Sequence, residues 1–341
     1  MRTIGKSTLW NHRERAEIQE LEVRRLLSSA VSAASMIANV PTWWQAKPMI
    51  QLDTASIGVN AGGSTTPLGL TPAEMRAAYG VDQISFANIV GDGTGQTIAI
   101  VDAYDDPNAL SDLQAFDAAF GLPDPPSFQK LNQVGTTSPL PATDPAGPGI
   151  DTWEGEESLD IEWAHVIAPN ANIILFEANT AGSDLYSAVH AASLTPGVSV
   201  VSMSWAGSEF AQEIALDPLF TTPTGSGGIT YLASAGDSGA FAKGDSTITP
   251  NYPTASPNVV SVGGTTLNLS GTVYGSESGW GNGLSSWIYD GGGGGISQYE
   301  TQPKYQNGIV NAFSTTQRVY PDVAMEADPA TGVPIYDTFD F

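Results

Sequence analysis

The segment Gly155-Glu156-Glu157-Ser158-Leu159-Asp160-Ile161-Glu162 places two carboxylates, Glu156 and Asp160, four residues apart. If this segment is helical, both side chains lie on one face of the helix. Two carboxylates held close together cannot both ionise cheaply, so one tends to keep its proton and the pair titrates as a unit. Such a pair can act as a general base or acid without histidine. A solvated acidic helix face has the same spacing, so a second signal is needed to favour chemistry.

That second signal is the segment Ala233-Ser234-Ala235-Gly236-Asp237-Ser238-Gly239. A similar sequence surrounds the serine of chymotrypsin-like proteases, which need a histidine base. The three histidines do not supply one, because His12 lies in a basic leader and His165 and His190 lie in helical patterns without a catalytic signature. The hydrophobic periodicity is also α/β rather than that of an all-β barrel. Ser238 is therefore not predicted to be a nucleophile.

The elements that must position these residues alternate along the chain. Strands are expected at Thr97–Ala103, Asn172–Ala178, Val198–Trp205, Ile229–Ser234 and Val259–Val262, and helices at Leu110–Phe120, Glu156–Ile167 and Asp184–Ala192. Nearly continuous apolar strands separated by helices predict a mostly parallel sheet that is covered on both faces. A Pro/Gly loop is expected at Gly135–Ile150, and the run Gly291–Gly295 is expected to be a surface loop.

Three regions are expected along the chain. Residues 1–45 form a basic leader, and residues 46–70 are rich in Gly, Ser, Thr and Pro and are typical of a linker. An ordered domain is expected over residues 71–341. Thr71 suits a helix N-cap, Pro72 suits the first turn, and Glu74 completes a capping box.

Charge and composition exclude several classes of protein. The net charge is −24, and seven of the twelve basic residues lie within residues 1–47, so residues 48–341 carry 5 basic and 32 acidic residues, or −27. Such an acidic body repels phosphates, so no nucleic-acid partner is expected. The chain has no cysteine, hence no disulfide or thiolate metal site. No apolar stretch is long enough to predict a membrane span.

The leader contains a weak export signal. Arg24 and Arg25 precede the moderately apolar residues 26–40, and Leu21–Ser28 resembles an export-associated segment of some bacterial secreted proteins. An ordinary amphipathic helix is the alternative. A secreted or extracytoplasmic location is expected on this basis.

The order of the motifs resembles the sedolisin family, the serine-carboxyl peptidases. The resemblance covers roughly residues 70–341. It is carried by E-x-x-L-D-I-E and A-G-D-S-G, together with Ser202–Trp205, Pro253–Pro257, Gly263–Thr265 and Pro321–Gly332. It implies a subtilisin-like three-layer α/β/α fold with a mostly parallel central sheet, incomplete at its C-terminus. It also implies a serine-type endopeptidase whose partner is a protein or peptide substrate.

The resemblance also implies catalytic roles. Glu156 matches the family's general base, and Asp160 matches the acid that orients it. Asp237 matches the aspartic acid of the oxyanion site, which must be protonated to donate a hydrogen bond. Since base and oxyanion acid hold opposite protonation states, such a site is expected to work at acid pH.

Further residues match the surroundings of the family's catalytic site. Asp102 matches an acid linked to the catalytic glutamate, and Trp205 matches the tryptophan of the same network. Ser204 and Gly207 are expected to border the substrate backbone. For Asp102 and Trp205, ordinary packing at a strand end is the alternative.

One part of the family pattern is missing. The family's serine lies in a Gly-Thr-Ser segment beyond Asp328-Pro329-Ala330-Thr331-Gly332, and no Gly-Thr-Ser occurs in the 341 residues. No nucleophile is therefore expected in this chain. The resemblance also implies a calcium site that uses residues near the missing C-terminus, so no metal site is expected here, although calcium is expected for a complete family member. Three interpretations stay open: a fragment of a working acid endopeptidase, a catalytically inactive truncated homologue, or a peptide-binding pseudo-peptidase.

Overall fold

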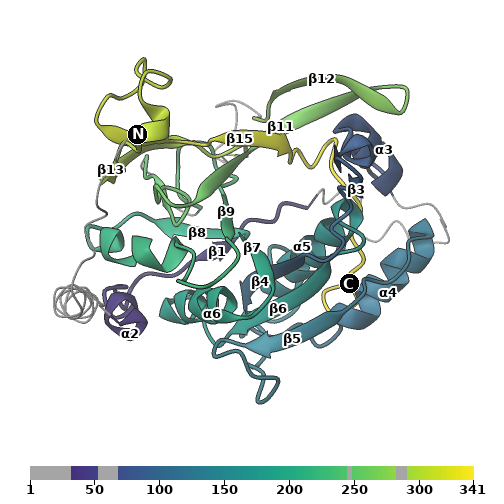
Figure 1. The fold of residues 1–341 in the computed structure, drawn as a ribbon, viewed down its shortest axis with the longest axis horizontal. Helices are drawn as coiled ribbons and strands as arrows, with labels where there is room; N and C mark the ends of the chain where they lie inside the picture. The colour runs from purple at the N-terminus through teal and green to yellow at the C-terminus, as the bar shows by residue number, and fades with distance from the viewer. Residues whose placement is uncertain (1–31, 53–67, 244–247, 282–289) are drawn as a thin grey trace, which may run out of the picture.

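The apolar run Thr97–Ala103 forms β4, in the middle of the central sheet. The computed structural model describes residues 32–52, 68–243, 248–281 and 290–341 (Figure 1). The sheet follows the order β12-β11-β9-β7-β4-β6-β5, and β15 also pairs with β11. Its other strands are β5 (Phe128–Asn132), β6 (Asn172–Ala178), β7 (Val198–Met203), β9 (Thr230–Ser234), β11 (Val260–Ser270), β12 (Val273–Gly279) and β15 (Val323–Glu326). All its pairings are parallel except β11 with β12, which confirms the predicted mostly parallel sheet.

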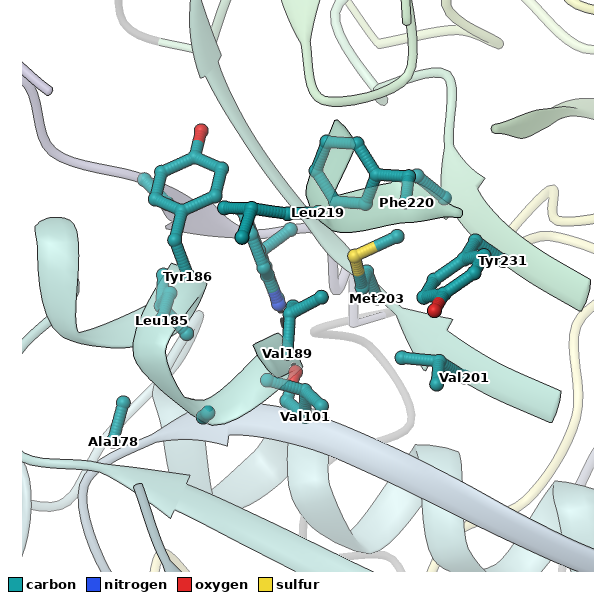
Figure 2. Close-up of a cluster of buried hydrophobic side chains, with 14 of the residues drawn as sticks. Val101, Ala178, Leu185, Tyr186, Val189, Val201, Met203, Leu219, Phe220 and Tyr231 are labelled. Atoms are coloured by element: carbon teal, nitrogen blue, oxygen red, sulfur yellow. Dashed lines mark hydrogen bonds between the residues drawn. The ribbon is translucent and has the colours of Figure 1, made fainter. Parts of the chain in front are cut away.

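Helices cover both faces of the sheet. Successive side chains of a strand point to opposite faces, so nearly continuous apolar strands give the sheet two apolar faces to bury. On one face, Ile100 packs with residues of α4 (Ala109–Phe120) and α5 (Trp153–Ile167). On the other face, Val101 packs with residues of α6 (Ser183–Leu194) in the larger core. Figure 2 shows this larger core, in which Leu185 and Val189 of α6 lie over the strands.

The remaining elements extend the body at its edges. They are α2 (Ala33–Ile37), β1 (Lys47–Pro48), α3 (Pro72–Ala78), η2 (Val81–Gln83), β2 (Ser85–Phe86), β3 (Ile89–Val90), β8 (Trp205–Ser208), η3 (Glu213–Phe220), β10 (Asn251–Tyr252), β13 (Gly295–Thr301), η4 (Lys304–Gln306) and β14 (Gln317–Tyr320). The capping box of Thr71 and Glu74 is present at the start of α3, as predicted. The C-terminal segment lies beside α4 and α5, where the Thr338 amide donates to Asp112 at 2.7 Å (Figure 1).

The first part of the predicted linker packs on the body. Ala46, Met49 and Ile50 are buried, and β1 pairs antiparallel with β8. The linker was predicted from the composition of residues 46–70 as a whole. Its first residues are apolar, and they are buried against the body of the protein. Residues 53–67 of that linker, and most of the leader with its export-like segment, lie outside the described residues.

The predicted strand Val198–Trp205 is divided at Ser204, so that β7 ends at Met203 and β8 begins at Trp205. Residues Val198–Met203 continue the central sheet, whereas β8 joins a separate three-stranded sheet between β1 and β10. The break leaves Ser204 at the end of a central strand.

The glycine run was predicted to be a surface loop, and this was wrong. The Gly291 amide donates to the carbonyl oxygen of Asp237 at 3.0 Å, and Gly291 and Gly293 are buried. A Cβ added to Gly293 would lie 2.1 Å from the carbonyl oxygen of Ala235. The glycines therefore allow two backbones to approach closely, which composition alone does not reveal.

This close approach gives a stability prediction. We expect Gly293→Ala to lower the free energy of unfolding by about 1–3 kcal/mol, because backbone atoms must move to admit the methyl group. Urea denaturation measures the change. Gly279→Ala is the control, since a Cβ there meets no atom within 4 Å. Equal stabilities for the two variants would contradict the close packing of the run.

Candidate active site

Helix α5 carries the paired carboxylates. Its N-cap, Thr152, accepts a hydrogen bond from the Gly155 amide at 3.1 Å, so the helix starts at Trp153, three residues earlier than predicted. Glu156 lies in the first turn, where the helix dipole favours negative charge. Because the segment is helical, Glu156 and Asp160 share one face as the spacing predicted.

Asp160 contacts Ser204, the residue that separates β7 from β8. The Ser204 hydroxyl donates to Asp160 Oδ1 at 2.7 Å. Burial raises the pKa of Asp160 to about 6, and the hydrogen bond from Ser204 opposes that rise. Glu156 is buried, and burial raises its pKa well above the ordinary range. The charges of Asp160, Asp102 and Asp237 raise it further, so these carboxyl groups form one electrostatic cluster.

Asp237 follows the end of β9, after Gly236 in a left-handed conformation with φ of +109°. Removal from water raises the pKa of Asp237 to about 7, whereas the positive charge of Lys243 lowers it. The carboxyl group therefore keeps its proton in acidic solution and can donate a hydrogen bond there. This is the protonation state that an oxyanion-binding acid needs.

Asp102 and Trp205 lie beside this cluster. Asp102 is fully buried near the end of β4, and its carboxylate oxygens have no hydrogen-bond partner among the described residues. Its pKa is raised well above the ordinary range by burial and then by the charges of Asp160 and Glu177. The Trp205 indole donates to the carbonyl oxygen of Val101 at 2.7 Å, next to Asp102 in the chain.

An extended segment of the chain's own N-terminal region lies along β8. We call residues 44–51 the strap. Lys47 is opposite Ala206 and Pro48 is opposite Trp205. The Met49 amide donates to the carbonyl oxygen of Ser204 at 2.9 Å. A peptide backbone therefore lies on β8 beside the carboxylates.

Gly207 receives the start of the strap. A Cβ on Gly207 would lie 2.8 Å from the Trp44 ring, which is 1% exposed. The Trp44 indole also donates to the carbonyl oxygen of Ser208 at 2.9 Å. Sequence reasoning expected Ser204 and Gly207 at a bound backbone but did not foresee the strap. The aromatic and apolar residues around Trp44 and Met49 were the available signal.

Sequence reasoning also missed Lys243. Its ammonium group donates to the carbonyl oxygens of Pro48 at 3.1 Å and Ile50 at 3.3 Å. It is one of only five basic residues after residue 47, among 32 acidic ones. This small number of basic residues was the only feature of the sequence that could have indicated a role for Lys243.

Among residues 32–52, 68–243, 248–281 and 290–341, no group of three or more His, Cys, Asp or Glu side chains is arranged to hold a metal ion. In the same residues, no helix is both long and apolar enough to cross a membrane.

The chain is similar to peptidases of known sequence and structure. The profile of the subtilase family matches residues 152–338, more than half of the chain. Kumamolisin of Bacillus sp. (strain MN-32) is 35% identical over 288 residues, covering 79% of this chain and 48% of that protein. Sedolisin of Pseudomonas sp. (strain 101) is 26% identical over 310 residues, covering 86% and 50%. The structure of Pseudomonas sedolisin complexed with two molecules of pseudo-iodotyrostatin matches with a TM-score of 0.65 and 28% identity, over 80% of this chain and 75% of that chain.

These similarities confirm the subtilisin-like α/β fold and support the resemblance to sedolisins. The chain spans about half the length of the curated relatives it matches. The roles of the individual site residues stay predictions.

The hydrogen bond between Ser204 and Asp160 can be tested by titration. We expect Ser204→Ala to raise the pKa of Asp160 above about 6, because the hydrogen bond that stabilises the carboxylate is lost. Side-chain carbon NMR over a pH series measures the pKa. Ser199→Ala, on the neighbouring β7, should leave it unchanged. A pKa that does not move in Ser204→Ala would show that the hydrogen bond does not control Asp160.

The raised pKa of Asp237 also predicts how the stability of the fold depends on pH. Burial raises its pKa to about 7 in the folded chain, from the value of 3.8 that applies to the unfolded chain. Between these two pH values the folded chain therefore binds more protons than the unfolded chain. Its contribution to stability is therefore complete below about pH 4 and is lost as the pH rises toward about 7. We expect Asp237→Asn to become more stable relative to the unchanged chain as the pH rises. Urea unfolding at several pH values tests this, and a pH-independent difference would contradict it.

Proposed function

Because the chain belongs to the subtilase family, we propose that it is the carboxylate-bearing part of a serine-type endopeptidase that hydrolyses proteins at acid pH. The observation that carries the proposal is the strap, an extended peptide that pairs with β8 beside the carboxylates. Proteases hold their substrates in this extended form, through backbone hydrogen bonds to a strand. We assign the peptidase domain to residues 71–341 and its setting to an acidic, extracytoplasmic space.

The proposed mechanism uses three carboxyl groups. Glu156 takes the proton of the attacking serine, Asp160 orients Glu156, and Asp237 donates a hydrogen bond to the oxyanion. The serine itself is proposed to lie outside these 341 residues, since they contain no Gly-Thr-Ser segment. A base, its orienter and an oxyanion donor act as a unit, so each is needed for full activity.

Repulsion within the cluster supports work at acid pH. Because each lost proton makes the next harder to remove, the cluster loses its protons one at a time. In the state with a single negative charge, the Glu156–Asp160 pair can serve as the base while Asp237 keeps its proton. Loss of a second proton would leave the oxyanion without its donor. The proposed activity therefore falls on both sides of a mildly acid optimum, between the pKa of Asp160 of about 6 and that of Asp237 of about 7.

The strap also favours a second candidate function, a catalytically inactive homologue that binds peptides. Pairing of a peptide with β8 requires no nucleophile. The two candidates agree on the ligand, an extended peptide, and differ only in whether a bond is broken.

The test is made on the native protein from its source. We expect an intact mass clearly above the 35.5 kDa of these residues, together with hydrolysis of a denatured protein in assays from about pH 4 to about pH 7. Glu156→Gln should lower that activity by at least about 1,000-fold, because the general base is lost. Asp124→Asn, an exposed acid, is the control. Peptide binding without hydrolysis across the acid range would support the second candidate and contradict the first.

A further inference from the structure

The strap is held on both edges of its backbone. In an extended strand, successive carbonyl groups point to opposite edges. The Met49 amide faces β8, where it donates to Ser204. The carbonyl oxygens of Pro48 and Ile50 face the other way, and both accept hydrogen bonds from the Lys243 ammonium at 3.1 and 3.3 Å. Lys243 thus contacts the strap on the side opposite β8.

The charge of Lys243 also acts on the catalytic carboxyl groups. It lowers the pKa of Asp237 and that of Glu156, against the larger effect of burial in each case. The other charged groups acting on Asp237 are Asp151 and Asp290, and those acting on Glu156 are Asp160, Asp102 and Asp237. All of these are acids, so Lys243 opposes them alone among the residues named for either group.

An ordinary surface ion pair does not account for this placement. Lys243 lies 3.7 Å from Asp151, whose side chain is 47% exposed, whereas the Lys243 side chain is only 19% exposed. A pair this long with an exposed partner holds a lysine weakly. The two carbonyl contacts are shorter, and they occur on either side of the residue that pairs with Ser204.

We propose that Lys243 is a peptide-binding residue, which donates to the outward carbonyl oxygens of any extended peptide lying on β8. The inference rests on the proposed function and adds to it a backbone-reading contact that is independent of the peptide's side chains. With a substrate in place of the strap, Lys243 would contact the carbonyl groups that flank the residue facing Ser204.

Hydrogen exchange of the strap in the 341-residue chain tests the contact. We expect Lys243→Met to speed exchange of the Met49 amide about 10- to 100-fold, because two charge-assisted hydrogen bonds are lost. Lys243→Arg should restore slow exchange. Lys304→Met is the matched control, since it removes the same charge from an exposed lysine of η4.

Carbon NMR titration of the same variants gives the second readout. Lys243→Met should raise the pKa of Asp237, whereas Lys304→Met should leave it unchanged. Unchanged exchange at Met49 in Lys243→Met would overturn the proposal, and so would faster exchange at all amides including those of β4, because that indicates general loosening. Neither readout needs catalysis, so either outcome stands apart from whether the native protein hydrolyses peptides.

Discussion

The structure depends on burying carboxylic acids where almost no positive charge is available. Residues 48–341 contain 5 basic and 32 acidic residues. A buried carboxylate without a cation or several hydrogen bonds is costly, and protonation removes that cost. Protonation therefore neutralises these carboxyl groups, as a lysine or arginine does for buried acids in other proteins. This applies to the cluster of Glu156, Asp160, Asp102 and Asp237 and also away from it, where burial raises the pKa of Glu213 to about 10 and that of Glu300 to about 9. Fold and proposed chemistry thus share one requirement, that buried carboxyl groups keep their protons.

The parallel sheet brings the site residues to one place. Asp102 lies near the carboxyl end of β4, Ser204 follows β7, and Asp237 follows β9. The carboxyl ends of parallel strands share one edge of a sheet, and ligands bind there in open α/β sheets. Helix α5 starts above this edge, so its first two turns present Glu156 and Asp160 to the strand ends. The sheet thus converts three distant sequence positions and one helix into a single cluster.

Local patterns in the sequence predicted this scaffold well, because they report local physics. The strands Thr97–Ala103 and Asn172–Ala178 were predicted at their observed bounds, since each is a nearly continuous apolar run. The helical spacing of Glu156 and Asp160 was likewise readable from the sequence. The Gly291–Gly295 run and the strap were not, because each depends on a distant partner. A glycine that admits the backbone of Ala235 looks the same in sequence as one in a loop. A strand of two residues, Lys47 and Pro48, has no periodicity to detect.

The strap also sets a condition for any peptide that is to reach β8. Its binding is intramolecular, so an incoming peptide competes with an effective concentration that is on the order of millimolar for short connections. The contacts of the strap fall into two kinds. Its pairing with Ser204 and Lys243 uses only backbone atoms, and a substrate can make the same contacts. A change that weakens these backbone contacts weakens binding of the strap and of the incoming peptide alike, so their relative occupancy of β8 stays the same. The packing of Trp44 against Gly207 depends on a side chain, so it favours the strap over any peptide that lacks an aromatic residue there. Under the proposed function, Trp44 therefore controls access of a peptide to β8, while Ser204 and Lys243 contact the peptide backbone beside the carboxylates.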